Sequence, residues 1–141
     1  MREILFRGKR LNNGEWVCGS YVYQYGAHEI YLPSTDGNGF DYYNINPETV
    51  GQYTGLVDRN GNKIFEGDIF LLDCDLLAIV IFKHGSYCLE VHGYCGCFTE
   101  SGYDECGGGF GVIECEPIDW YCIGDMETLG NIHDNPELLE R

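Results

Sequence analysis

Four cysteines lie close together in the second half of the chain and could supply thiolates to a metal ion. They are Cys95, Cys97, Cys106 and Cys115, with Cys88 and Cys122 on either side. Four thiolates around a tetrahedral zinc ion form a common structural site, but such sites usually use Cys-x2-Cys turns, and this sequence has none. We therefore expect no cofactor and inert thiols, because free cysteine is a small, commonly buried residue. Structural zinc and a local redox or disulfide role remain as alternatives.

A pair of carboxylates, Glu66 and Asp68, flanks Gly67. Such a pair could hold a metal or perform acid–base chemistry, as in a metal-dependent enzyme. The alternative is a tight turn in which Gly67 takes a conformation that other residues avoid and Asp68 accepts hydrogen bonds from nearby backbone. We favour the turn. The glycines at 107–111 are not followed by Lys-Ser or Lys-Thr, so they form no phosphate loop. We predict that the protein is not an enzyme.

A row of tyrosines marks the first clear strand, expected from Trp16 to Tyr25. Side chains alternate across a strand, so Tyr21, Tyr23 and Tyr25 should share one face. The row is a candidate recognition surface for a partner or for stacked bases. The alternative, which we favour, is packing against a neighbouring strand.

The centre of the chain, from Val50 to Leu72, carries the strongest hairpin signal. Asn60-Gly61 separates Tyr53–Val57 from Ile64–Phe65 and predicts a two-residue type I′ turn, with positive φ at both residues. Apolar or alternating stretches predict further strands at Glu3–Arg7 (ended by Gly8), His28–Leu32, Ile69–Leu72, Leu76–Phe82, Tyr87–His92, Phe110–Glu116 and, beyond Pro117, Ile118–Ile123. The stretch from Asp68 to His92 should form a three-stranded meander.

Helical turns are expected at only two places. The Asn-Pro-Glu triplets that begin at Asn46 and Asn135 each combine an N-cap residue with proline at the first helical position. The first should form a single turn, and the second a short helix that closes the chain.

Charge restricts the possible partners. The 141 residues, enough for one domain or two small ones, include 23 Asp and Glu against eight Lys and Arg, a formal net charge of −15. This balance tells against direct binding to nucleic acid, whose phosphates attract Lys and Arg. Four of the eight bases fall in the first ten residues, whereas the chain after residue 100 holds ten acids and one base. No apolar run approaches the roughly 20 residues of a membrane helix, and the N-terminus is no signal peptide, so we expect a cytoplasmic protein.

Three blocks of sequence resemble one protein family. They are REILFRGKR with NGEWV near the start, PETVGQYTGL continuing to EGDI in the centre, and LGNIHDNPELL at the end. In this order and spacing they resemble the YopX family of small phage and prophage proteins, although residues 88–122 are richer in Cys and Gly than the family. The central signature comprises Gly51, Gln52, Tyr53, Thr54, Gly55, Asn60, Gly61, Glu66, Gly67 and Asp68.

The resemblance implies a fold and an origin but no catalytic residues. It implies an all-β protein with minor α content: an N-terminal β-region (1–46), then an SH3-like barrel with a short C-terminal helix (47–141). It also implies phage origin and self-association. We expect a non-enzymatic, oligomeric protein-interaction module in the host cytoplasm, whose partners are itself and a host or phage protein. The alternative is an acidic DNA mimic that inhibits a host nucleic-acid-binding protein.

Overall fold

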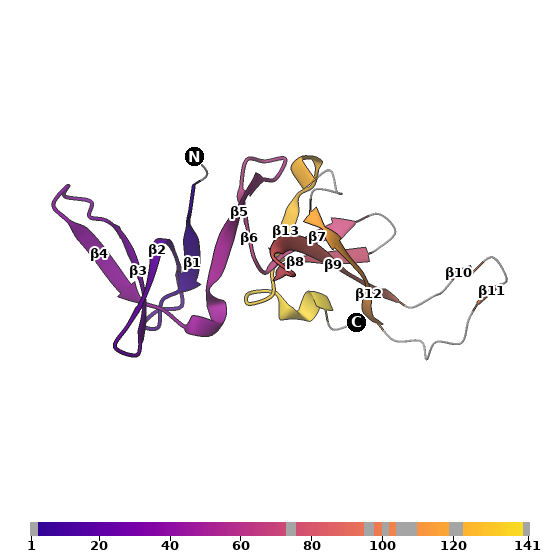
Figure 1. The fold of residues 1–141 in the computed structure, drawn as a ribbon, viewed down its shortest axis with the longest axis horizontal. Coiled ribbons are helices and arrows are strands. Elements are labelled where there is room, and N and C mark those ends of the chain that lie inside the picture. The colour runs from indigo at the N-terminus through magenta and orange to yellow at the C-terminus, as the bar shows by residue number, and fades with distance from the viewer. Residues whose placement is uncertain are drawn as a thin grey trace. The chain divides into compact units, whose positions relative to one another are not determined.

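The computed structural model describes residues 3–72, 76–94, 98–99, 102–103, 110–118 and 123–139. The chain divides into two compact units. Unit 1 is Met1–Leu56 with Lys63–Phe65, and unit 2 is Val57–Asn62 with Glu66–Arg141. The expected boundary followed residue 46; in this division residues 47–56 stay with the N-terminal part. Both units are built on antiparallel strands, so the all-β prediction with minor helical content is confirmed (Figure 1).

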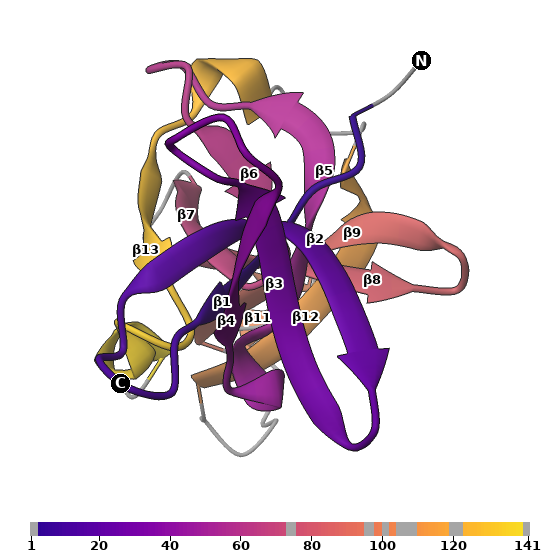
Figure 2. The same ribbon diagram turned by 90° about the vertical axis from the view of Figure 1, so that its left-hand side faces the viewer.

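Unit 1 is a six-stranded sheet with the order β4-β3-β2-β1-β5-β6. Its strands are β1 (Phe6–Lys9), β2 (Trp16–Gln24), β3 (Ala27–Pro33), β4 (Phe40–Asn44), β5 (Gly51–Val57) and β6 (Lys63–Phe65). β2 and β3 run side by side as a hairpin (Figures 1 and 2). Their turn, Tyr25-Gly26, has φ of +51° and +77°, as a two-residue type I′ turn requires.

The first strand differs from its prediction. Gly8 lies buried inside β1, paired with Val17, and does not end the strand. A Cβ atom at Gly8 would come 2.7 Å from Cδ1 of Ile45, so the glycine serves close packing and not a turn. The Asn12-Asn13-Gly14 turn joins β1 to β2, with φ of +70° at Gly14.

The core of unit 1 forms around Val17, Ile30 and Ile45. The short helical turn η1 (Pro47–Thr49) comes shortly after Ile45 in the chain. It has the predicted cap, since the Asn46 side chain accepts from the Glu48 N–H at 3.1 Å. The buried Thr49 hydroxyl joins this turn to β1: it accepts from the Lys9 N–H at 2.9 Å and donates to the Asn46 carbonyl at 2.7 Å.

The central turn is not the predicted two-residue type. Of the two residues, only Gly61 has positive φ (+81°). The turn begins at Asp58 and ends at Asn62, and the Asp58 N–H donates to the Asn62 carbonyl at 2.9 Å. The loop therefore has three residues, with the left-handed Gly61 as its last, a common alternative for Asn-Gly sequences. The two-residue form occurs instead at His84-Gly85, where φ is +52° and +80°.

Unit 2 contains a five-stranded sheet with the order β12-β9-β8-β7-β13. Its strands are β7 (Asp68–Leu72), β8 (Leu76–Lys83), β9 (Ser86–Tyr94), β12 (Phe110–Pro117) and β13 (Thr128–Asn131). The predicted meander is confirmed as β7-β8-β9. Among the described strands β12 and β13 form the two edges and no pairing closes the sheet, so the SH3-like barrel remains a prediction.

Four consecutive residues of β8, from Leu77 to Val80, are buried, as expected for a strand covered on both faces. The core cluster Ile69, Leu77 and Ile79 packs against Leu138 and Leu139, which lie in the closing 3-10 turn η5 (Pro136–Leu139). That turn occupies the place of the predicted short helix. A separate two-stranded pair joins β10 (Phe98–Thr99) to β11 (Gly102–Tyr103).

The segment after residue 116 corrects another prediction. Pro117 is the last residue of β12, paired with Cys88, and not a break between strands. Ile123, the expected end of the next strand, begins the 3-10 turn η4 (Ile123–Asp125). Residues 119–122 of that predicted strand lie outside the described residues. In the described part of the chain, no helix is both long and apolar enough to span a membrane.

Candidate functional site

One hollow on unit 2 has a volume of about 520 Å³ and combines apolar walls with charged residues. β7, β8 and β13 contribute four leucines, and the segment before β13 contributes a methionine and two acids. The lining residues are Leu71, Leu72, Leu76, Leu129, Met126, Arg59, Asp125 and Glu127. Leu71 and Leu129, which are 48% and 46% exposed, both line the hollow and give it exposed apolar surface.

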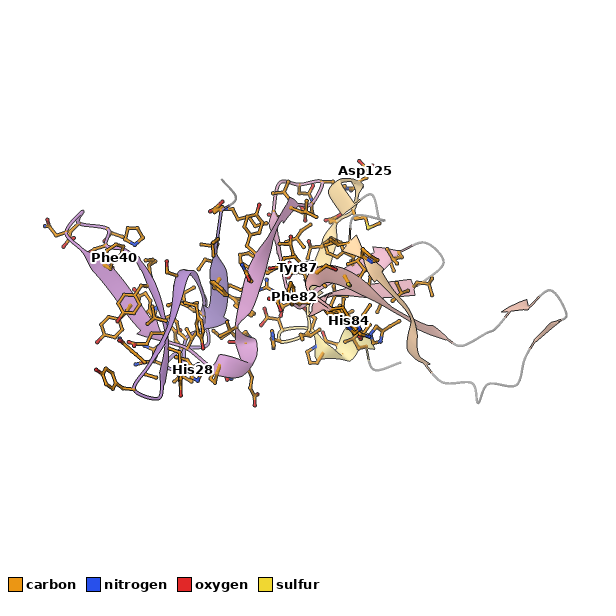
Figure 3. The ribbon with its side chains drawn as sticks, viewed as in Figure 1. His28, Phe40, Phe82, His84, Tyr87 and Asp125 are labelled. Atoms are coloured by element: carbon orange, nitrogen blue, oxygen red, sulfur yellow. The ribbon has the colours of Figure 1, made fainter. Side chains whose placement is uncertain are left out.

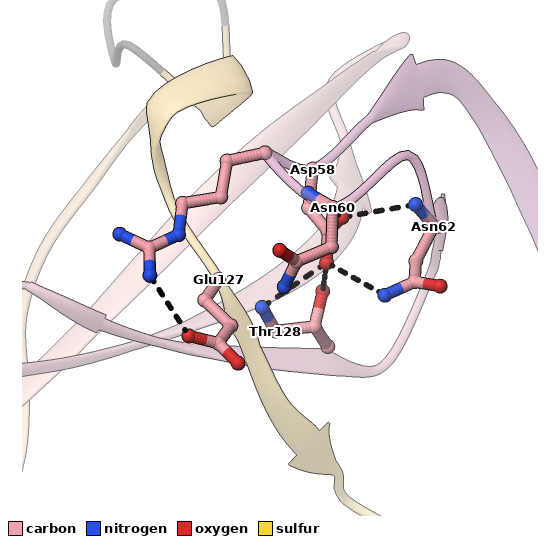
Figure 4. Close-up of polar contacts among 6 residues, drawn as sticks. Asp58, Asn60, Asn62, Glu127 and Thr128 are labelled. Carbon is pink, nitrogen blue, oxygen red and sulfur yellow. Dashed lines mark hydrogen bonds and ion pairs between the residues drawn. The ribbon is translucent and has the colours of Figure 1, made fainter.

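One buried carboxylate fixes the charged side of this hollow. Asp58 is only 3% exposed and accepts five hydrogen bonds (Figure 4). Its Oδ1 accepts from the N–H groups of Asn60 and Asn62, each at 2.9 Å. Its Oδ2 accepts from the Asn62 amide at 3.3 Å, and from the Thr128 N–H and hydroxyl at 3.3 and 3.0 Å. Asp58 thereby joins the 58–62 loop to the start of β13.

These hydrogen bonds set the pKa of Asp58. Burial alone raises the pKa of a carboxyl group, but the bonds from Asn62, Thr128 and Asn60 outweigh burial and lower it to about 2. The side chain is therefore ionised near neutral pH, with donors already on both oxygens. Such a carboxylate organises the backbone around it and is poorly suited to act as a general base, which needs a pKa near the working pH.

Arg59 lies beside this anchor at the rim of the hollow. Its N–H donates to the Met126 carbonyl at 2.9 Å, and its guanidinium lies 3.4 Å from Oε2 of Glu127. Both side chains are more than half exposed, so the ion pair contributes roughly 0–1 kcal/mol at most. The backbone position is fixed, but either charged group can turn to an incoming partner at little cost.

The tyrosine row is only partly formed. Tyr21 is half-buried, packs near the core of unit 1 and hydrogen-bonds Nδ1 of His28 through its hydroxyl. Tyr23 is 62% exposed, with its ring 4.6 Å from the His28 ring. Tyr25 lies beyond the end of β2 in the turn and is fully exposed, so it does not belong to the row. The predicted packing therefore holds for Tyr21, while Tyr23 and Tyr25 remain available at the surface.

The candidate zinc ligands are not brought together by any described geometry. Cys95, Cys97 and Cys106 lie outside the described residues, and Cys115 falls in β12 with its side chain undescribed. In the parts of the chain that are described, no three His, Cys, Asp or Glu side chains form a group that could hold a metal ion. Of the described cysteines, Cys18 has its pKa raised by burial, against the opposing charges of Arg7 and Lys63.

The Glu66-Gly67-Asp68 segment has the geometry of the predicted turn. Gly67 has φ of +90°, donates its N–H to the Val80 carbonyl at 2.8 Å and accepts from the Ile132 N–H at 2.9 Å. Asp68 is buried at the start of β7, only 3% exposed. The segment therefore connects the strands of unit 2, and Asp68 lies inside the fold.

The rest of the signature also has structural positions. Gly51 and Gln52 pair with β1 opposite Arg7 and Phe6. The buried Tyr53 ring lies 5.7 Å from the Phe65 ring. Thr54 accepts from the Leu56 N–H through its hydroxyl at 3.2 Å, and Gly55 has φ of +90° within β5.

Asp58 was missed as a site residue. The local signal was present in Asp58-Arg59-Asn60-Gly61-Asn62, since Asp at the start of a turn commonly accepts from backbone N–H groups two and more residues on. Thr128 carries no such signal, because it lies 70 residues away in sequence.

Comparison with known proteins agrees with the resemblance noted in the sequence. No curated protein matches the chain. Residues 5–140, nearly its full length, match the family described as "YopX protein". This match includes the Asp58 loop, the hollow and most of the three signature blocks, and the chain therefore belongs to the YopX family.

Proposed function

We propose that this YopX-family protein is a non-enzymatic, oligomeric protein-interaction module, and that unit 2 presents the acidic, partly apolar surface that a basic partner protein recognises. The family resemblance supports an origin in a phage or prophage and action in the cytoplasm of the bacterial host. The partner would then be a host or phage protein.

The observation that carries the proposal is the division of charge between the units. Unit 1 has six Asp and Glu against five Lys and Arg, whereas unit 2 has 17 against three. Nearly the whole net charge of −15 therefore belongs to one compact unit. Such a concentration attracts positively charged partners over several ångströms and speeds their encounter with the surface.

The hollow of unit 2 would supply the short-range contacts. Its exposed leucines, Leu71 and Leu129, offer apolar area, while Asp125 and Glu127 lie at its charged side. An apolar centre with a charged rim is the usual anatomy of a protein interface. A partner segment with an apolar anchor beside Lys or Arg fits this chemistry.

The state of the carboxylates also supports binding over catalysis. Asp58 is ionised and holds five hydrogen bonds within the fold. Asp68 is buried at a strand start, beside a turn that the backbone hydrogen bonds of Gly67 hold in place. These two groups serve the architecture of unit 2.

The test is capture of partners from a bacterial host lysate with the tagged full chain, at low and high salt, with and without nuclease. The proposal expects a protein partner that nuclease treatment does not release and that high salt weakens, because exposed charges are screened beyond about 10 Å at 0.1 M salt. Recovery that depends on intact nucleic acid would overturn it.

An acidic DNA mimic is the alternative, favoured by the same 17-to-three ratio in unit 2. Under this alternative the partner is a host nucleic-acid-binding protein, and DNA competes for the same site. Adding duplex DNA to the captured complex separates the two proposals. DNA should displace the partner of a mimic, but it should not displace a partner that is bound in the apolar hollow.

A further inference from the structure

β4 is an outer strand of the unit 1 sheet that carries two exposed aromatic side chains. Phe40 is 69% exposed and Tyr42 is 56% exposed. Figure 3 labels Phe40 on this strand. Tyr42 stacks on Tyr31 of β3, with 5.3 Å between ring centroids, so its ring is held in place. Strand edges of this kind are sites where another strand can add.

The hydrogen bonds around β4 show which of its backbone groups face outward. The Ile45 N–H donates inward to the carbonyl of His28 in β3, whereas the Asn44 carbonyl accepts from the Leu11 N–H on the opposite side. Successive residues of an antiparallel strand alternate in this respect. The N–H and C=O groups of Phe40 and Tyr42 therefore point away from the sheet, and the segment at Leu11 covers the edge only from Asn44 onward.

We propose that β4 pairs antiparallel with β4 of a second copy of the chain, which would extend the unit 1 sheet across a two-fold axis. The inference rests on the oligomeric part of the proposed function and specifies its interface. With the axis at Asp41, Phe40 of each copy lies opposite Tyr42 of the other. Both outward-facing residues then form hydrogen-bonded pairs, and pairing stops before the segment at Leu11.

The side chains in this register favour self-pairing on one face. Each Phe40 meets a Tyr42 of the second copy, and aromatic pairs directly across two strands are stabilising. The balance of six acids and five bases in unit 1 allows two copies of that unit to approach, whereas the acidic unit 2 would repel its like. Charge thus favours unit 1 as the meeting surface.

The opposite face limits the affinity. Asp41 lies opposite Asp41 of the second copy, and like charges directly across a strand pair are destabilising. The exposed parts of the four rings amount to about 500 Å², below the roughly 1,200 Å² of a stable interface. The dimer should therefore be weak and reversible, with a Kd on the order of 0.1 mM.

Sedimentation equilibrium of the full chain, up to about 1 mM, tests the pairing. The wild type should approach the mass of two chains. Tyr42→Lys and Phe40→Lys should each raise Kd at least about tenfold, because lysine on a strand edge opposes strand addition. Tyr25→Lys is the matched control, since it removes an exposed ring and adds the same charge in the β2–β3 turn. Circular dichroism confirms that each variant is folded.

Asp41→Asn decides between a second copy and a basic partner strand. Self-pairing predicts that it lowers Kd about two- to five-fold, by removing the like-charge pair. A higher Kd would show that Asp41 meets a cation, which overturns the register. A dimer that neither lysine variant weakens would overturn the β4 interface but leave the proposed oligomer, whereas a monomer at every concentration would overturn both.

Discussion

The hydroxyl of Thr128 donates to the buried carboxylate of Asp58 at 3.0 Å, across 70 residues of sequence. Through this contact the central loop of the chain and the strand nearest its C-terminus share one anchor. The exposed charges of Arg59 and Glu127 take their positions from it. The shape of the hollow in unit 2 therefore depends on a residue that does not line it.

Replacing the anchor should destabilise unit 2. In Asp58→Asn an amide NH2 group replaces one oxygen, so donors from Asn62 or Thr128 lose their acceptor inside the protein. We expect unfolding free energy to fall by about 2–3 kcal/mol, the usual cost of a broken hydrogen bond to a buried charge. Urea denaturation measures this change. Asp36→Asn, at an exposed carboxylate that accepts from the Asn38 N–H, is the control and should change stability by under about 0.5 kcal/mol. Equal losses in the two variants would refute the anchor.

The Asp58 carboxylate should also make the stability of the protein depend on pH. The pKa of Asp58 is about 2 in the folded protein against an ordinary value of 3.8. A lowered pKa means that ionisation favours folding, so its contribution is complete above pH 3.8 and disappears as the pH falls toward 2. Thermal unfolding should show a loss of Tm over this window that is smaller in Asp58→Asn. Identical pH profiles in both proteins would contradict the assignment.

Gly19 should be the least replaceable glycine of unit 1. A Cβ atom there would come 2.2 Å from the backbone oxygen of Tyr31, a contact that only movement of β2 from β3 relieves. Gly19→Ala should cost at least about 2 kcal/mol, within the range for an overpacked core. Gly124→Ala is the control because a Cβ atom there meets nothing within 4 Å. Chemical denaturation measures the stability of both variants. Similar losses in Gly19→Ala and Gly124→Ala would contradict the packing role of Gly19.

Tyr25 occupies a backbone position that suits a different residue. Its φ is +51°, a region that bulky side chains avoid and asparagine tolerates, and its side chain is fully exposed. Tyr25→Asn should therefore stabilise the β2–β3 hairpin by about 0.5–1 kcal/mol. Differential scanning calorimetry should show a higher Tm, and a lower Tm would mean that the ring supports the fold.

Local signals made much of the fold predictable. The type of most strands, the Asn46 cap and the Gly67 turn each depend on a few adjacent residues, and all three were predicted. The Asn60-Gly61 turn was predicted in the wrong form because Asp58, two residues earlier, attracts the N–H groups of Asn60 and Asn62 and lengthens the loop.

Features that depend on distant residues could not be predicted. Gly8 resembles a strand end in sequence, and only its approach to Ile45 shows why glycine is needed inside β1. The hollow has the same origin, because its lining comes from residues 59, 71, 72, 76, 125–127 and 129, which the fold brings together. β4, with the sequence FDYYN, was not predicted as a strand either, because its apolar and polar residues do not alternate strictly.

The central claim is that unit 2 binds a protein partner through its acidic, apolar hollow. The most direct test captures partners from host lysate with the wild type and with a Leu71→Lys/Leu129→Lys variant, after nuclease treatment and at two salt concentrations. Tyr25→Lys is the control bait, because it adds an exposed lysine outside the hollow. We predict that wild type and Tyr25→Lys each recover one protein in an amount close to that of the bait. High salt should weaken the binding of this protein, and the double variant should not recover it. Equal recovery by the double variant and the wild type would contradict the claim.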